Sequence, residues 1–356
     1  MASSELKKEA YKITRLLFKR MNIKNFILSI PQNNKFTKQT PMFILILFLV
    51  IFPIAMSGNK YRLGVMTTVG INALIVIGLN LLMGYAGQVS LGHAGFFGIG
   101  AYCSGLLNVN LGMSPWISTV IAIIFTAIVA YIIGVPTLKL KGHYLAMATL
   151  GFGEIVYVVL SKLDWLTKDT SGLLGIYPFS LGFIDLDSNF ALGQYIFVWI
   201  IVLAIIILSL NITKSRVGRA FRAIHGSEIA ASAMGVNIAK YKVQVFVLSA
   251  IYAALAGSLY AHFHGFIGYP TFHLGTSITL VTMVIVGGSG SLWGAILGTI
   301  LLTWLPEWLS VIKKYDIVIY GLLLMLVMIF MPDGLVGRLS ALISHIKVKL
   351  SIPSND

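Results

Sequence analysis

The chain has 356 residues, of which 57% are hydrophobic and 11% are charged, and its mean hydropathy is +0.89. Because soluble globular domains carry about 25% charged residues, this composition excludes a soluble protein and leaves no room for a second soluble domain of normal size. The net charge of +14 is concentrated in residues 1–40 (nine basic residues, two Glu) and residues 211–242 (six basic residues, one Glu), and this placement argues against nucleic-acid binding.

The first forty residues are polar and basic, with no apolar region of the kind that a cleavable signal peptide requires. We therefore expect residues 1–40 to form a basic cytoplasmic segment. Two interpretations stay open for it, a plain extension and an amphipathic helix on the membrane surface.

From residue 41 onward, apolar runs of about the length that crosses a bilayer follow one another. A segment in lipid must satisfy its own backbone, and the ten-residue alternation of barrel strands is missing, so these runs predict α-helices. The expected spans are 41–57, 64–83, 89–110, 115–137, 143–161, 191–210, 243–265, 275–290, 293–312 and 316–331. The sequence thus predicts an all-α polytopic membrane protein with about ten transmembrane helices (range 8–10), a transmembrane domain over 41–337 and a cytoplasmic tail over 338–356.

Basic residues between the spans predict the orientation. If the N-terminus is inside, Lys139, Lys141, the loop 211–242 and the tail all fall inside, and the acidic loop 162–190 falls outside. The inner segments then sum to +15 and the outer ones to +1. This asymmetry predicts a multi-pass protein of the bacterial inner membrane with both termini in the cytoplasm.

Glycine marks two further stretches, residues 84–105 and 287–298. Small residues allow membrane helices to approach closely, and the similar segments SLGHA (90–94) and SLWGA (291–295) suggest an internal repeat around a pathway through the membrane. The single cysteine, Cys103, excludes an internal disulfide and a thiolate metal site, so we expect no metal and no cofactor.

Polar side chains within apolar spans are functional candidates, because burying them in lipid is costly. The candidates for a translocation pathway are Gln88, Ser90, His93, Thr149 and Glu154. A structural interpretation stands beside the functional one: His93 as a packed histidine, and Glu154 as a hydrogen-bonding partner of a neighbouring helix. No arrangement of side chains predicts a catalytic site.

The loop 211–242 contains a pattern for a short ordered helix. Ser227 is a helix-capping residue, Glu228 suits the first helical position, and Gly235 is suited to end the helix after an alanine-rich turn. Such a helix would present a small knob to a groove on a partner. A solvated positively charged loop is the alternative, and it explains the charges but not the helix signals.

The segment Ala230-Ala231-x3-Gly235 resembles the coupling motif of ABC-importer permeases, although Ile229 stands where that motif has Glu, and Glu228 precedes it. The segment GYAGQVSLGHAGFFGIGAY (84–102) resembles the signature of the branched-chain amino-acid ABC permeases, M-type (leucine/isoleucine/valine) subunits in particular. Further blocks at 138–142, 148–155, 170–176, 215–220, 286–294 and 331–335 follow in family order, so the resemblance covers about residues 64–337.

This resemblance implies the ABC-importer permease fold and the import of branched-chain or related amino acids. It also implies a second homologous permease subunit, two ATP-binding subunits, and a periplasmic or lipid-anchored substrate-binding protein, in contact with membrane lipid. The chain has no G-x4-GK[ST] phosphate loop, so ATP hydrolysis is expected on a separate chain and this subunit is not expected to be an enzyme. The residues expected to dock the ATPase are Arg216, Arg219, Glu228, Ala230, Ala231 and Gly235.

Two alternatives remain open. One keeps the mechanism and changes the cargo to urea or short amides, other amino acids, or sugars. The other is a secondary transporter driven by H⁺ or Na⁺, with Glu154 as the coupling acid.

Overall fold

The computed structural model describes residues 35–55, 59–162, 172–180 and 191–309, with the single residues 321, 325 and 334. The chain divides into two compact units, Met1–Ile54 and Ala55–Asp356. In the first unit the structure describes helix α2 (Lys35–Ala55), which ends at the boundary between the two units.

The second unit is built almost entirely of helices. Its longer helices are α3 (Lys60–Asn80), α4 (His93–Leu111), α5 (Pro115–Thr137), α6 (His143–Ser161), α8 (Ala191–Lys214) and α11 (Ile238–His264). The shorter ones are the π-helical turn η1 (Leu81–Tyr85), α9 (Arg216–Gly226), α10 (Glu228–Ala233), the 3₁₀ turn η2 (Tyr269–Phe272), α12 (Leu274–Gly287) and α13 (Leu292–Leu309).

Within the described residues, five helical segments are long and apolar enough to cross a membrane: Lys60–Tyr85, Pro115–Thr137, His143–Ser161, Ala191–Lys214 and Ile238–His264. Shorter apolar helices are Met42–Ile54, Leu274–Gly287 and Leu292–Glu307. The prediction of an all-α polytopic membrane protein is therefore confirmed. The expected span 316–331, the tail 338–356 and most of the basic segment 1–40 lie outside the described residues, so the number of ten spans stays a prediction.

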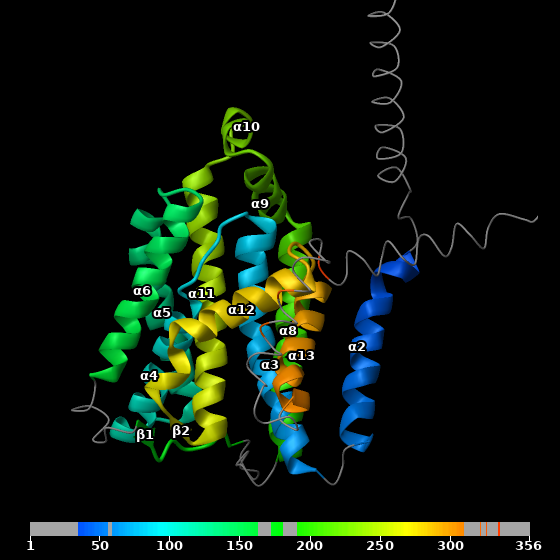
Figure 1. Cartoon of the computed structure of the whole chain (residues 1–356), viewed down its shortest axis with the longest axis vertical. Coiled ribbons are helices and arrows are strands. Elements are labelled where there is room, and N and C mark those ends of the chain that lie inside the picture. Colours follow the sequence, from blue (N-terminus) through cyan, green and yellow to red (C-terminus); the bar gives the residue numbers. More distant parts are fainter. Residues whose placement is uncertain are drawn as a thin grey trace, which may run out of the picture. The chain divides into compact units, whose positions relative to one another are not determined.

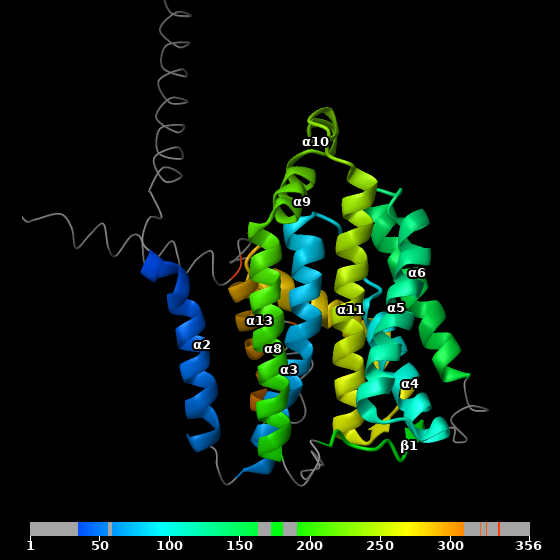
Figure 2. The ribbon, with the colours of Figure 1, turned by 180° about the vertical axis from the view of Figure 1, so that it is seen from behind.

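Helix α11 forms the centre of the second unit and packs against α3, α4 and α5 (Figure 1). Helices α8 and α13 pack on α3, and α6 packs on α4, as the reverse view also shows (Figure 2). Small residues allow this packing: a Cβ added to Gly100 of α4 would lie 2.4 Å from the carbonyl oxygen of Ala254 in α11. Close backbone approach of this kind replaces the hydrophobic effect as a source of helix association in lipid.

A two-stranded ladder is the one departure from helix among the described elements. Strand β1 (Leu173–Leu174) pairs antiparallel with β2 (Phe266–Ile267), with Leu173 opposite Ile267 and Leu174 opposite Phe266. Both strands lie in segments that connect helices. The ladder satisfies backbone groups that would otherwise face the apolar core, which explains strand pairing within an all-α architecture.

The predicted spans 115–137 and 143–161 match α5 and α6 residue for residue. The span expected to begin at residue 89 is wrong at its start, because α4 begins only at His93. Helix α11 begins five residues before the expected 243, where the Asn237 side chain accepts a hydrogen bond of 3.1 Å from the backbone N–H of Lys240. Helix α8 continues to Lys214, past the expected end at 210.

Candidate functional sites: a braced surface helix and a broken helix

The structure gathers basic residues at one end of the second unit. This end consists of the α5–α6 turn, the end of α8, α9, α10 and the start of α11, and α10 forms its tip (Figure 1). Its basic residues are Lys139, Lys141, Lys214, Arg216, Arg219, Arg222, Lys240 and Lys242. The opposite end, where α3 begins and α6 finishes, has Lys60, Arg62 and Lys162 among the described residues. The fold thus places the basic residues of the α5–α6 turn and of the segment 214–242 at one end.

The sequence analysis did not predict helix α9, because it treated residues 211–226 as part of a loop. Helix α9 begins after Ser215, whose Oγ accepts hydrogen bonds from the backbone N–H groups of Val217 (3.1 Å) and Gly218 (3.5 Å). Phe221 and Ile224 are buried, whereas Arg216, Arg219 and Arg222 are exposed. The cap and the helical spacing of Phe221 and Ile224 were the signals available in the sequence.

Helix α10 has the two ends that the sequence predicts. Ser227 Oγ accepts a hydrogen bond of 3.3 Å from the Ala230 N–H. At the other end Gly235 has φ = +82°, its N–H donates to Ser232 O (2.9 Å), and the Val236 N–H donates to Ala231 O (3.0 Å). This pair of bonds is the Schellman arrangement, which needs a residue that tolerates the left-handed conformation. A helix of only six residues is therefore ordered by its caps.

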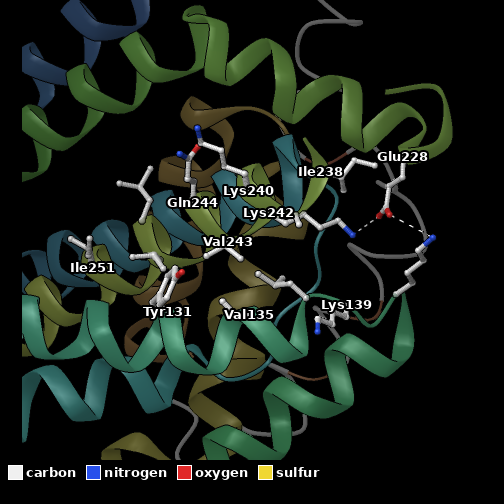
Figure 3. A pocket seen from close by; sticks show the side chains of 15 residues that line it. Tyr131, Val135, Lys139, Glu228, Ile238, Lys240, Lys242, Val243, Gln244 and Ile251 are labelled. Atoms are coloured by element: carbon white, nitrogen blue, oxygen red, sulfur yellow. Dashed lines mark ion pairs between the residues drawn. The ribbon is translucent and has the colours of Figure 1, made fainter. Parts of the chain in front are cut away.

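An ion pair braces α10 against the helix bundle. Glu228 Oε1 lies 2.6 Å from Nζ of Lys242 in α11, and Glu228 Oε2 lies 3.7 Å from Nζ of Lys141 in the α5–α6 turn (Figure 3). The Lys242 side chain is only 3% exposed, so solvent cannot hydrate its ammonium group if the ion pair is removed. Sequence reasoning placed Glu228 in the docking site but missed both lysines as its partners.

The remaining predicted docking residues divide between two faces. Four of them, Arg216, Arg219, Ala230 and Gly235, are exposed. Ala231 is buried on the inward face of α10. The outer surface also carries two large apolar side chains, Ile229 (81% exposed) and Met234 (84% exposed). Neither was singled out as a contact residue from the sequence.

The second site is a break in regular helical structure between α3 and α4, two separate helices that run in opposite directions (Figure 1). The chain leaves η1 at Tyr85, runs without regular helix through residues 86–92, and enters α4 at His93. Two N–H groups near the start of α4 are satisfied by side chains from other helices: Leu91 N–H donates to Thr149 Oγ1 of α6, and Ala94 N–H donates to Ser277 Oγ of α12, both at 3.0 Å. Irregular backbone at membrane depth is tolerated where protein groups satisfy it in this way.

His93 lies fully buried at this break. Ser249 Oγ donates to the Phe246 carbonyl (2.8 Å), so it accepts from His93 Nε2–H at 3.0 Å, and Ser90 Oγ donates to His93 Nδ1 at 3.0 Å. Both ring nitrogens are thus used, which corresponds to a neutral imidazole packed between α4 and α11. The structure therefore brings Ser90, His93 and Thr149 to one break in the helix, and all three side chains are engaged within the chain.

Gln88 and Glu154 are not part of that hydrogen-bonded group. The Gln88 side chain is buried and donates to the Ala86 carbonyl at 3.1 Å. Glu154 is half-buried on α6 and makes no hydrogen bond or ion pair with any residue that the structure describes. Glu228 is paired with lysines, and Glu307 accepts a hydrogen bond from the Tyr61 hydroxyl.

Asn80 joins the two glycine-rich stretches. Its Nδ2 donates to Ser291 O at 2.7 Å, and its Oδ1 accepts from Gly290 N–H at 2.8 Å. A Cβ added to Gly84 would lie 2.1 Å from the Gly290 nitrogen, so the two backbones are in direct contact. The segments SLGHA and SLWGA each lead into a helix, α4 and α13, and the internal repeat stays a prediction. In the described part of the chain, no group of three His, Cys, Asp or Glu residues could hold a metal ion.

The apolar helices, the irregular segment between α3 and α4 and the basic end with its braced helix define a polytopic α-helical membrane protein. The chain belongs to the family described as branched-chain amino acid transport system / permease component, whose profile matches residues 61–332.

Three curated relatives illustrate the similarity. The permease protein LivM of the high-affinity branched-chain amino acid transport system of Escherichia coli is 32% identical over 294 residues, which is 77% of this chain and 66% of LivM, just under two thirds. A probable branched-chain amino acid transport permease LivM from Methanocaldococcus jannaschii is 23% identical over 72% of this chain and 81% of its own length. The E. coli permease LivH is 36% identical over 40% of this chain and 46% of its own length. No solved structure matches the chain.

Proposed function

We propose that this chain is the membrane-spanning permease subunit of an ATP-binding-cassette importer that translocates branched-chain or related amino acids. Membership of the family and the transport functions for which the relatives are named support this proposal. The chain contains no phosphate-binding loop, so ATP is hydrolysed by partner chains. A second homologous permease, two ATP-binding subunits and a substrate-binding protein complete the transporter.

The observation that carries the proposal is the construction of α10. Two large apolar side chains, Ile229 and Met234, are more than 80% exposed on a capped and ion-paired helix. An exposed apolar pair on an ordered projection suits insertion into a groove of a partner, and the exposed arginines of α9 suit an acidic rim around that groove. The partner is the ATPase, on the cytoplasmic side that the clustered basic residues indicate.

The ion pair between Glu228 and Lys242 connects the proposed docking helix α10 to the long apolar helix α11. A displacement of α10 acts on α11 through Glu228 and Lys242, and α11 packs directly on α4, whose first residue ends the segment 86–92. Rigid helices connected by close packing transmit such movements as rigid-body shifts. In this scheme Ser90, His93 and Thr149 hold the segment 86–92 in place, while Gln88 of that segment and Glu154 of α6 lie along the pathway.

The test replaces the apolar pair with Ile229→Ser/Met234→Ser in the complete transporter. We expect the nucleotide-binding subunits to be lost from the detergent-purified complex by at least about tenfold, and ATP-driven uptake to be lost with them, at an unchanged amount of permease in the membrane. Leu111→Ser is the matched control, because Leu111 is a 63% exposed apolar residue at the opposite end of the unit. Normal co-purification and uptake in the double variant would reject the docking role.

One observation favours a second candidate, an ion-coupled secondary transporter. Glu154 is a half-buried carboxylate in an apolar helix without a partner among the described residues, as expected of a proton-coupling acid. In that case Glu154→Gln would abolish uptake, an uncoupler would collapse it, and no ATPase would be needed. Under the main proposal, uptake follows ATP hydrolysis and survives the uncoupler.

The cargo is tested separately from the mechanism. Branched-chain amino acids, other amino acids, urea or short amides, and sugars are offered in turn with the substrate-binding protein encoded for this system. Uptake of leucine, isoleucine or valine supports the cargo proposal, and uptake of urea or a sugar in their place contradicts it while leaving the ATP-driven mechanism intact.

A further inference from the structure

A groove of about 840 Å³ opens between α5 and α11 at the basic end of the second unit (Figure 3). Its volume falls in the range of small-molecule binding sites. None of the exposed residues through which α10 is proposed to dock lies in this groove, although Glu228 and Lys242 of the brace form part of its wall. The proposed function therefore leaves the groove itself unexplained.

The walls of the groove are mainly apolar, with Gln244 as a polar lining residue. Tyr131 and Val135, one turn apart on α5, face Val243, Val247 and Ile251, which follow one face of α11. Tyr131 is 58% exposed and Val135 is 41% exposed, so the α5 wall is open at its side. In a helix that crosses the membrane, an apolar slot with an open side is accessible to the hydrocarbon chains of lipid.

The mouth of the groove is cationic. Four lysines line it, Lys139, Lys141, Lys240 and Lys242, against one carboxylate, Glu228, which gives a local charge of +3. Glu228 binds Lys242 closely and Lys141 more loosely. Lys139 and Lys240 are exposed and form no ion pair with any residue in the described ranges. The mouth therefore has unused positive charge for an anion.

The charge lies where two long apolar helices end. Lys139 follows the end of α5 at Thr137, and Lys240 lies in the first turn of α11, so both flank long apolar spans. Lysines at such positions extend toward the membrane surface, where lipid phosphates are found. A soluble anion would use the mouth but not the apolar walls, whereas a phospholipid would use both.

We propose that this groove binds one anionic phospholipid. Its phosphate lies between Lys139 and Lys240, and an acyl chain lies along Tyr131, Val135 and Val247. Basic pockets between transmembrane helices are known to hold anionic headgroups in this manner. The bound headgroup would border the pair of Glu228 and Lys242, so the lipid would add to the contacts that hold α10. The lipid site depends only on the groove, and it stands even if α10 does not dock an ATPase.

The experiment is native mass spectrometry of the full chain purified in mild detergent and supplied with dioleoyl phosphatidylglycerol or dioleoyl phosphatidylcholine. We expect one phosphatidylglycerol molecule to be retained per chain, at least about tenfold more tightly than phosphatidylcholine. In Lys139→Gln/Lys240→Gln the affinity for phosphatidylglycerol should fall roughly 30-fold, since each lysine near a lipid surface contributes about fivefold. Val135→Ser tests the apolar wall and should weaken both lipids.

Lys214→Gln/Arg219→Gln is the matched control, because it also removes two positive charges at the same end but outside the groove. It should retain phosphatidylglycerol like the unmodified chain. An unchanged affinity in the double lysine variant, or an equal loss in Lys214→Gln/Arg219→Gln, would overturn the proposal. Displacement by excess glycerol 3-phosphate would identify a phosphate site without a lipid. Loss of the lipid on assembly of the complete transporter would show that a partner chain occupies the groove instead.

Discussion

At the scale of single residues, a few polar contacts support the proposed function. Lys242 is the clearest case, because it is buried at the start of an otherwise apolar helix and has Glu228 as its counter-ion at 2.6 Å. The sequence predicted the capped helix that carries Glu228, since caps depend on neighbouring residues. It could not predict the pairing with Lys242, because that contact depends on how α10 folds back over α11.

Removing the lysine of this pair should loosen α10. Lys242→Met leaves Glu228 without its close partner, and because Glu228 is partly exposed we expect a cost of about 1–2 kcal/mol, below that of a fully buried pair. Hydrogen exchange of residues 228–236 should accelerate roughly tenfold. Lys214→Met, an exposed lysine at the same end but outside the groove, serves as the control. The double variant Glu228→Gln/Lys242→Met should recover part of the protection, and strictly additive effects would contradict the brace.

Gly235 is the second residue whose role follows from local geometry. Its φ of +82° is unfavourable for proline, whose ring fixes φ near −65°, and its N–H donates to Ser232. Gly235→Pro should therefore unfold the end of α10 and abolish uptake while membrane insertion stays intact. Gly235→Asn tolerates the left-handed conformation and should keep most of the activity. Normal uptake by the proline variant would show that α10 is not required.

At the scale of elements, the sequence predicted the limits of α5 and α6 but not the start of α4. The limits of α5 and α6 agree with the sequence because glycine, proline and polar residues bound them. The start of α4 was expected four residues too early, at Val89. The groups that stabilise the break, Thr149 and Ser277, come from α6 and α12, and no local pattern reveals such distant partners.

The broken segment should weaken when those hydroxyls are removed. Thr149→Val and Ser277→Ala each leave one buried N–H without its acceptor, at an expected cost of about 1 kcal/mol, the lower part of the usual range for such groups. Thermal unfolding in detergent should show this as lower midpoints. Thr126→Val is the control, since the Thr126 hydroxyl is equally buried but bonds only the Ala122 carbonyl of its own helix. Equal losses in all three variants would contradict a special role for the break.

At the scale of the whole molecule, basic residues cluster at one end of the second unit. Basic residues that are distant in sequence meet at the end formed by the α5–α6 turn, α9, α10 and the start of α11. The distribution of charge along the sequence predicted this asymmetry, because the positive-inside rule depends only on the order of spans and loops. The groove between α5 and α11 was not predictable, because its walls come from helices about one hundred residues apart.

The central claim is that α10 contacts a separate ATPase on the cytoplasmic side. Site-specific photo-crosslinking from position 234 in intact cells tests it most directly, with position 111 at the opposite end as the control. The account predicts a crosslink from position 234 to a nucleotide-binding subunit and none to that subunit from position 111. A position 234 that reacts only with reagents applied outside the cell, or that crosslinks to no nucleotide-binding subunit, would contradict it.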